Sequence, residues 1–517
     1  MRIATNVSAI VSNNALQKSQ DRLTKSIARL SSGYKINSSS DDAAGYAISE
    51  KMRLQLRGLN QADNNAADGV SVLHTAEGAM EEIQSMLARM KELSVQAANG
   101  TNSVDERSAI QSEIDSLNSE IDRISSNTEF NSQTLISGNL SRRVYSNYEG
   151  VNQIEVSDNF VAGNYGITIT QDARQAIVVG NGAVTMSDTA TVTKEQAGTI
   201  SMNGYGIEIS EGDTLAGIMG KLVDGADKIG GCVFAITAGA TNDTKVNGTD
   251  YAGYEPQTSY AGNNIVFMTK ESGSSKTMNI TCSNAELANM LGIATAATNS
   301  GMYAEGSDVQ AEFTLDNDGK RVGFADSAVI STSGTRVTVK DVNNRTFVTD
   351  VPSNVAGTQF SDTAKADDKS TATSTQTAKV TQEVTDVGTM SVHVGANENQ
   401  VILIDIPAVT SYTLGTENLN VMTSVTASEA IDTIDTAVAY ANRVRSQMGA
   451  YENRFEHTTN NLGTASENLT SAISTMTDTD MAEEMTEYTS LNVMTQAATS
   501  ILAQANERPS TVLQILQ

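Results

Sequence analysis

The sequence predicts a mainly α-helical fold at both termini, with long antiparallel rods that resemble a coiled coil, and a β-rich or α+β region inserted between them. Residues 1–135 and 427–517 are poor in proline and carry apolar side chains at heptad spacing. The residues between them are rich in Thr, Gly, Val and Ser and lack that spacing. Each terminal region therefore needs the other to bury its apolar side chains.

Length and composition narrow the class of protein. The chain has 517 residues, enough for several domains. Its net charge of −27 argues against binding to nucleic acid or to an anionic membrane. Aromatic residues make up only 4%, so we expect an extended or assembled structure rather than a compact enzyme. Because no run of residues is typical of a secretion signal or a membrane span, the sequence alone suggests a cytoplasmic protein.

The first part of the chain predicts three helices. A short amphipathic segment ends at Gly33, and a polar linker follows it to Asp42. Residues 43–98 then predict one helix about 80 Å long. After a turn at 99–102, Ser103 and Glu106 form a capping box that starts a further helix. Its apolar stripe comprises Ile110, Ile114, Leu117, Ile121 and Ile124, which predicts an antiparallel helical hairpin.

The far end of the chain has a matching pattern. One heptad frame runs from residue 431 to residue 476 and predicts a second long rod. The frame breaks at 477–480, where Asp480 and Glu483 form a new N-cap signature. A last stripe then runs to the terminus, with Pro509 as its one interruption.

The two outermost stripes are too short to be stable alone, because a helix gains most of its stability by packing its apolar face. We therefore expect them to be disordered until partners arrive, and to order by lateral self-assembly. The alternative is a soluble intramolecular coiled coil such as a stalk. The predicted assembly stripe comprises Leu16, Leu23, Ile27 and Leu30 near the start, and Leu491, Met494, Ala498, Ile501, Val512 and Ile515 near the end.

The middle region, residues 146–385, predicts one or two small β-rich domains. Alternating patterns predict strands at 166–170, 199–202, 205–210, 264–268 and 336–339. Short helices are predicted at 215–223 and 285–291. Residues 361–381 are of low complexity and predict a flexible tip or linker.

Residue patterns for catalysis or metal binding are absent from the sequence. His74, His393 and His457 are far apart, with no histidine or cysteine cluster, so no metal site, cofactor or enzymatic activity is predicted. Residues 315–319 look like a calcium loop, but the ligand positions are wrong and a hairpin turn is predicted. Cys232 and Cys282 form either a disulfide or two buried free thiols.

The segment Leu30-Ser-Ser-Gly-Tyr-Lys-Ile-Asn-Ser-Ser-Ser-Asp-Asp-Ala-Ala-Gly-Tyr-Ala-Ile-Ser49 resembles bacterial flagellin, as do Asn6-Val-Ser and the terminal Gln514-Ile-Leu-Gln517. The resemblance covers residues 1–140 and 385–517. It implies three domains. Residues 1–42 with 478–517 form a terminal helical core, 43–145 with 386–477 form a rod with a β-hairpin near 390–407, and 146–385 form a variable surface region.

The resemblance also implies a function and partners. The chain would be a structural subunit that polymerises into the flagellar filament for motility. It would be extracellular, exported unfolded by the flagellar secretion apparatus without a cleaved signal peptide, which overrides the cytoplasmic interpretation. Its partners would be copies of itself, an export chaperone, and the cap and hook-junction proteins. The alternatives are a hook–filament junction protein, or a filament subunit with an adhesive or glycosylated variable region.

Residues 87–96 resemble the rod segment that the flagellin-sensing Toll-like receptor of animal hosts contacts. This resemblance assigns the receptor contact to Arg89, Leu93 and Glu113. Lys91 stands where many activating flagellins carry Arg, which could cost a bidentate contact. Residues 199–237 and 264–292 are also similar to a small strand–helix–strand insert of the family, the hook "IN" motif.

Overall fold

The computed structural model describes residues 6–157, 160–180, 182–187, 189–237, 263–293, 302–316, 318–341, 345–353, 355–356, 359–360, 372–374, 377–385 and 387–516. The chain packs as two compact units. One comprises Met1–Val70, Val392–Ile402 and Asn453–Gln517, and the other comprises Ser71–Ser391 and Leu403–Glu452. The division between the units falls inside two long helices, which continue from one unit into the other. It does not fall at the helix breaks near residues 42 and 478.

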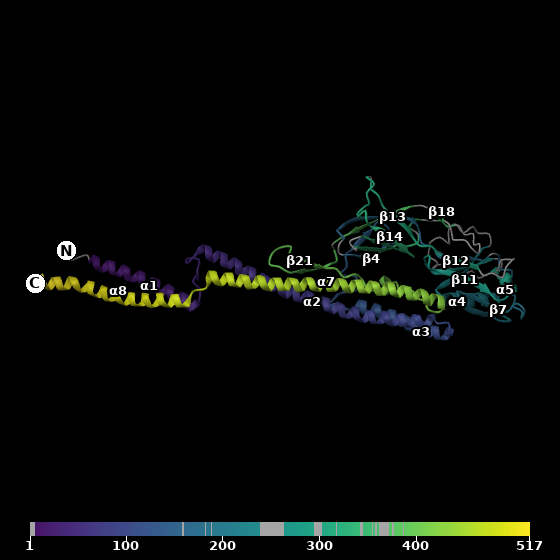
Figure 1. Cartoon of the computed structure of the whole chain (residues 1–517), viewed down its shortest axis with the longest axis horizontal. Helices are drawn as coiled ribbons and strands as arrows, with labels where there is room; N and C mark the ends of the chain where they lie inside the picture. Colours follow the sequence, from purple (N-terminus) through teal and green to yellow (C-terminus); the bar gives the residue numbers. More distant parts are fainter. Residues whose placement is uncertain are drawn as a thin grey trace. The chain divides into compact units, whose positions relative to one another are not determined.

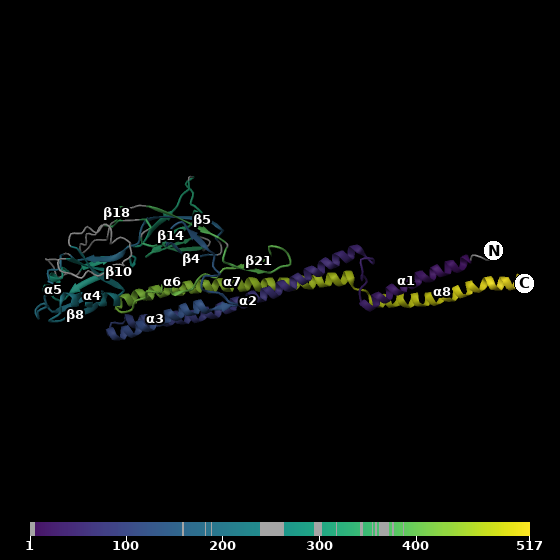
Figure 2. The same ribbon diagram turned by 180° about the vertical axis from the view of Figure 1, so that it is seen from behind.

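In the first unit, helix α1 (Val7–Ser32) lies beside helix α8 (Met481–Leu516), as Figures 1 and 2 show. The predicted stop of α1 is confirmed: Gly33 adopts φ of 77°, and its N–H donates to the carbonyl of Arg29 at 2.8 Å. Backbone bonds from Lys35 to Thr477 and from Thr479 to Gly33, at 2.7 and 2.9 Å, join the two linkers. The linker that follows α1 is therefore hydrogen-bonded to the linker that precedes α8.

The predicted start of α8 is also confirmed, since the Asp480 carboxylate accepts from the N–H groups of Ala482 and Glu483 at 2.8 and 3.2 Å. The predicted interruption at Pro509 is wrong, because α8 continues through it to Leu516. Proline has no N–H for the carbonyl four residues earlier, which belongs to Ala505. The side-chain amide of Asn6 donates to that carbonyl at 2.9 Å, which supplies the missing bond.

Three helices form the rod: α2 (Ala43–Ala98), α3 (Val104–Asn127) and α7 (Ser424–Thr477). The predicted bounds of α2 and the capping box of α3 are confirmed, with Ser103 N–H donating to Glu106 at 2.7 Å and Glu106 N–H to Ser103 at 3.3 Å. The buried side chains of α2 in the second unit follow helical spacing and include Met80, Ile83, Leu87 and Met90.

The stripe of α3 is shifted from its prediction. Ile110, Ile114 and Ile121 are buried, but Leu117 is only partly buried. Its neighbour Asn118 is buried instead and donates to the carbonyl of Thr416 at 2.7 Å. This bond offsets the desolvation of the Asn118 amide nitrogen, while the Oδ1 atom is buried without a hydrogen-bond partner among the described residues.

Two antiparallel sheets are built from strands near the beginning and near the end of the inserted region. Their orders are β13-β5-β19-β3 and β14-β15-β16-β4. A cluster that includes Phe160, Tyr165, Phe324 and Phe347 fills their core with edge-to-face ring contacts. The strands are β3 (Val144–Ser146), β4 (Asn152–Val156), β5 (Gly163–Gln171), β13 (Gln310–Phe313), β14 (Val329–Ser333), β15 (Arg336–Lys340), β16 (Thr346–Asp350) and β19 (Ala378–Val384).

Strand β19 corrects the prediction of a flexible segment at 361–381. Residues 361–371 and 375–376 lie outside the described residues, but β19 pairs with β5 and β3, with Val380 opposite Ile167. Its side chains at 378, 380, 382 and 384 are buried and the intervening ones are more exposed. This alternation is visible in the sequence, but the surrounding Thr, Ala and Lys obscured it.

A second hydrophobic cluster, separate from the first, lies against the helices of the inserted region and includes Ile218, Leu222, Phe267 and Leu287. It is bounded by sheets of order β12-β11-β7-β8 and β6-β10-β9. The described part of the insert therefore contains two main cores. Its elements are β6 (Gln175–Val179), β7 (Gly198–Met202), β8 (Tyr205–Ile209), α4 (Leu215–Lys228), β9 (Gly231–Thr237), β10 (Asn263–Ser272), β11 (Thr277–Cys282), α5 (Ala285–Met290) and β12 (Met302–Glu305).

Shorter elements complete the chain. The strand pairs are β1 (Glu129–Phe130) with β2 (Gln133–Thr134), β17 (Gln359–Phe360) with β18 (Ala372–Ser374), and β20 (Met390–His393) with β21 (Val401–Ile404), and α6 covers Ser411–Leu414. The last strand pair confirms the hairpin predicted near 390–407. The turn predicted at 315–319 is confirmed by the bridge between Leu315 and Arg321 and by Gly319 at φ of 75°.

Cys232 and Cys282 are free thiols, each only partly buried. Burial raises the pKa of both thiols, so they are less readily ionised than an exposed cysteine. Among the described residues, none of the helices combines the length and apolar character that a membrane crossing requires.

Candidate functional site

The facing sides of α1 and α8 form a thin apolar seam. Leu16 and Leu491 are buried in it, and Leu23, Leu30 and Ala498 are partly buried. A polar pair interrupts the seam, since Arg29 Nη1 lies 3.6 Å from the Oε2 atom of the buried Glu484. The seam thus contains residues of both stripes, but it covers only one side of each helix.

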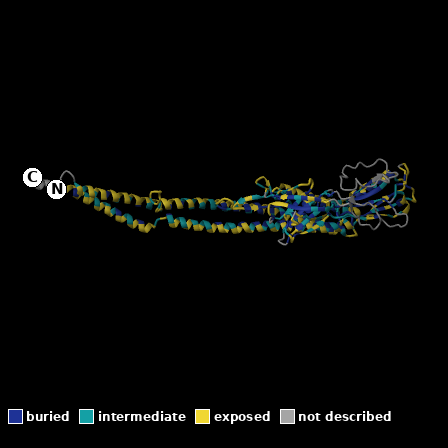
Figure 3. Ribbon diagram, turned by 90° about the horizontal axis from the view of Figure 1, so that it is seen from above, coloured by how far each residue is buried: buried dark blue, intermediate teal, exposed yellow. Residues whose placement is uncertain are grey.

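The outer sides of α1 and α8 expose large apolar side chains. Ile27 and Met494 are about half exposed, and Ile501 is 56% exposed. The sequence reasoning missed further members of this surface because they lie off the main heptad frame. The outer apolar surface, as we call it, comprises Val7, Ile10, Val11, Ile27, Met481, Met485, Val493, Met494 and Ile501. Figure 3 shows exposed residues along both terminal helices.

Two members of the predicted assembly stripe, Val512 and Ile515, belong to the backbone of α8, but their side chains lie outside the described residues. The stripe therefore divides into a buried seam and an exposed outer surface. Helical periodicity could not distinguish the buried seam from the exposed surface. It marks all apolar positions alike, whereas one partner helix buries only some of them.

Asn6 links the first residues of α1 to the last turns of α8. Its Oδ1 atom accepts from Ala9 N–H at 3.1 Å and caps α1, while its amide donates to Ala505. Both hydrogen-bonding ends of one side chain are used. The sequence shows Asn6 and Pro509 separately, but only the fold shows that one compensates for the other.

Of the three predicted receptor-contact residues, Arg89 and Glu113 lie together at the surface and Leu93 does not. Arg89 on α2 donates to Glu113 on α3 at 3.0 and 2.9 Å and to Glu92 at 3.2 Å. These carboxylates, Glu113 first, raise the pKa of the Arg89 guanidinium. Leu93, expected to share the surface, is only 2% exposed because it lies on the inner stripe of α2 with Met90. Lys91 forms an ion pair with Asp435 on α7.

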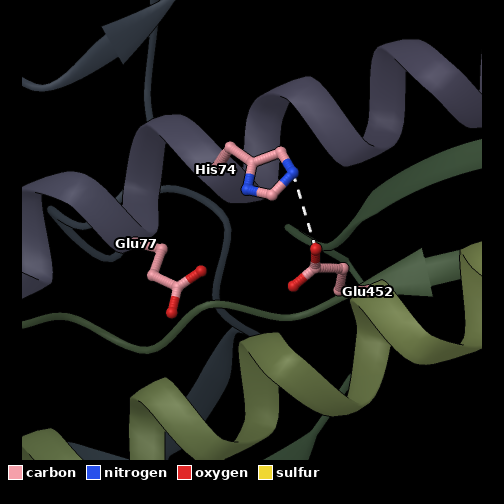
Figure 4. Close-up of side chains that lie close together, drawn as sticks. All are labelled: His74, Glu77 and Glu452. Carbon is pink, nitrogen blue, oxygen red and sulfur yellow. Dashed lines mark ion pairs between the residues drawn. The ribbon is translucent and has the colours of Figure 1, made fainter.

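One group of potential metal ligands escaped the sequence analysis. His74 and Glu77 on α2 and Glu452 on α7 place ligand atoms within 4.8 Å of one another. Figure 4 shows the three side chains, with His74 and Glu452 joined as an ion pair. Sequence spacing could not find the group, because Glu452 is brought to His74 only by the packing of two distant helices.

Comparisons with known proteins place these features in a family. The model of the bacterial flagellin N-terminal helical region matches residues 3–141, and that of the C-terminal helical region matches residues 431–516. Flagellin from Clostridium tyrobutyricum is 31% identical to the chain, covering 96% of this chain and 98% of the relative. Flagellin from Salmonella typhimurium is also 31% identical, covering 100% of this chain and 99% of the relative.

Among solved structures, FliC from Burkholderia pseudomallei is 14% identical and covers 75% of this chain and 99% of that one. Its TM-score is 0.22, which is too low to support an argument about the fold. The similarity in sequence is therefore the stronger finding.

Proposed function

The chain belongs to the bacterial flagellin family of filament subunits, and on that premise we propose that it polymerises by burying its outer apolar surface between copies of itself. The observation that carries this proposal is the exposure of so many large apolar side chains on one pair of helices. Exposed apolar surface of this extent marks interaction sites, because water solvates it poorly.

The energy available is large enough for assembly. Full burial of one Val, Ile or Met side chain contributes about 1.5–3 kcal/mol, and the outer apolar surface offers several of them. A neighbouring copy has a surface of the same kind, so identical subunits can cover one another. Repetition of such a contact in one direction produces a filament.

The exposure of apolar side chains on α1 and α8 also affects how stable these helices are in the monomer. With only one thin seam buried, the α1/α8 pair gains little from packing, so we propose that residues near 1–40 and 480–517 open readily in the monomer and become ordered on assembly. Hydrogen exchange on monomer and filament tests this. Strong protection of α1 and α8 in both states would contradict it.

Ile501→Asp tests the assembly surface directly. A charge placed in an apolar interface has no partner, so we expect no filaments by electron microscopy while circular dichroism of the monomer is preserved. Val329→Asp is the matched control, because Val329 is also well exposed but lies on strand β14 of the insert. Normal filaments from Ile501→Asp would overturn the proposal. Long filaments built from the wild-type chain alone would exclude the hook–filament junction alternative.

Localisation and export follow from the same premise. We propose that the chain acts outside the cell in the flagellum, contributes to motility, and leaves by the flagellar secretion apparatus without a cleaved signal peptide. An export chaperone and the cap and hook-junction proteins would be its partners. An intact mass of the filament protein that lacked an N-terminal segment would contradict uncleaved export.

We further propose that a host Toll-like receptor recognises the rod around Arg89 and Glu113. These two residues form an exposed charged pair across α2 and α3, and Leu93 supports them from the interior. Arg89→Ala should weaken receptor binding. The matched control is Arg123→Ala, because Arg123 is similarly exposed on α3 and pairs with Glu120. An equal effect of both substitutions would point to net charge rather than to a defined contact.

A further inference from the structure

Three side chains from two helices of the second unit lie close enough together to share one ion. His74 and Glu77 stand three residues apart on α2, which places them on the same face of the helix. Glu452 comes from α7, and its Oε1 atom lies 3.5 Å from His74 Nε2. Figure 4 shows that the side chains extend from the two helices into one small region.

The chemistry of the three groups is that of a metal site. An imidazole nitrogen and two carboxylate oxygens suit zinc and its neighbours in the first transition row better than magnesium or calcium, which prefer oxygen alone. Bonds of about 2.0–2.2 Å to zinc place neighbouring donors roughly 3.3 Å apart. The 3.5 Å spacing of His74 and Glu452 is already close to that value.

The group is open to solvent, and one of its members is held by a neighbouring arginine. His74 is 59% exposed and Glu452 39% exposed at their side chains, so an ion can enter without unfolding. Arg445 on α7 donates from Nε to Glu77 Oε1 at 3.2 Å and from Nη1 to Gln84 at 2.9 Å. It therefore orients Glu77 while its charge weakens the attraction for a cation.

We propose that His74, Glu77 and Glu452 bind a divalent transition-metal ion that joins α2 to α7. Water would complete the coordination, because the protein supplies three ligands. Such an ion would hold the two helices together in the folded state and have no equivalent site in the unfolded chain. Zinc should therefore stabilise the second unit, and the stabilisation should rise with the logarithm of the zinc concentration once that concentration exceeds the dissociation constant.

Calorimetric titration of the full-length monomer with zinc chloride tests the site. We expect one equivalent to bind, and a rise of about 5 °C in the unfolding temperature of the rod at saturating zinc. His74→Gln and Glu452→Gln should each reduce the affinity by about tenfold or more and make the temperature shift smaller at the same zinc concentration. Both positions are solvent-exposed, and helical circular dichroism of each variant verifies that it is folded.

The matched control is His457→Gln, which removes a histidine elsewhere on α7 and should leave the affinity unchanged. Arg445→Gln should strengthen binding several-fold, since it removes the competing cation. Zinc binding that is equal in wild type and His74→Gln, binding of magnesium as tight as that of zinc, or no zinc binding at all would overturn the proposal. Equal zinc binding in the variant or no zinc binding would leave the three residues as an ion-pair network only, and equally tight magnesium binding would exclude a transition-metal site.

Discussion

The α1/α8 pair and the three-helix rod start from the same kind of sequence and reach opposite degrees of burial. In the rod, the inner stripe of α2 is fully buried, as at Ile83 and Leu87. In the α1/α8 pair, Ile501 remains 56% exposed. The difference lies in the number of neighbours, because a helix with two partners is covered on more of its surface than a helix with one.

This comparison shows that an apolar stripe on a helix indicates packing against a partner but does not identify that partner. The rod provides partners within one chain, since α2 has two neighbours: Arg89 pairs with Glu113 on α3, and Lys91 pairs with Asp435 on α7. The α1/α8 pair provides them in part and leaves the rest for a neighbouring copy. Intramolecular stability and capacity for assembly are thus two outcomes of one pattern.

The largest expected effect compares the same substitution in the two regions. Ile83→Ala should lower the free energy of unfolding of the rod by about 2–5 kcal/mol, because it leaves a cavity in a covered core. Ile501→Ala should cost less than about 1 kcal/mol in the monomer, since its side chain is largely in water already. Urea unfolding followed by circular dichroism measures both. Equal losses would remove the distinction between covered and uncovered stripes.

A smaller effect concerns the bond between Asn6 and Ala505. Asn6→Ala should destabilise the α1/α8 pair by about 1–2 kcal/mol, because it removes both the cap of α1 and the donor for a carbonyl that Pro509 leaves without one. In the Pro509→Ala background the loss should shrink, since alanine at this position has a backbone N–H of its own to donate. Hydrogen exchange of α8 measures this coupling. The same loss in both backgrounds would show that the two residues are independent.

A pair of glycine substitutions should act with opposite signs. Gly33→Ala should destabilise the end of α1 by about 1 kcal/mol, because the position has φ of 77° although a Cβ atom would meet nothing within 4 Å. Gly78→Ala, in the interior of α2 with equal space, should stabilise the rod by about 0.5–1 kcal/mol. Thermal unfolding measures both shifts. A shift of the same sign at both positions would contradict the backbone argument.

The smallest expected effect depends on pH. Bonds from the Ser103 backbone and hydroxyl lower the pKa of Glu106 in the folded chain below its ordinary value of 4.5. The stabilising contribution is therefore present above about pH 4.5 and is lost as the pH falls through the lower, folded pKa. Glu106→Gln should flatten the pH dependence of rod stability in this window. An unchanged acid-unfolding curve would count against a role for this cap.

Much of the helical framework could be predicted from the sequence. The bounds of α2, the stop of α1 at Gly33 and the caps at Ser103 and Asp480 depend on residues close together in the chain, so local patterns suffice to locate them. Strand β19 escaped because its composition resembled a linker. Its identity became clear only through its pairing with β5 and β3.

Most helix ends and the apolar character of each position can thus be read from the amino-acid sequence, since they depend on neighbours along the chain. Which apolar residues are covered depends on the folded chain, as the burial of Leu93 and the exposure of Ile501 show. The tertiary structure also decided that Asn6 meets Ala505 and that Glu452 meets His74. Burial and ligand geometry depend on which distant helices pack together. Heptad spacing indicates only that a helix packs against some partner.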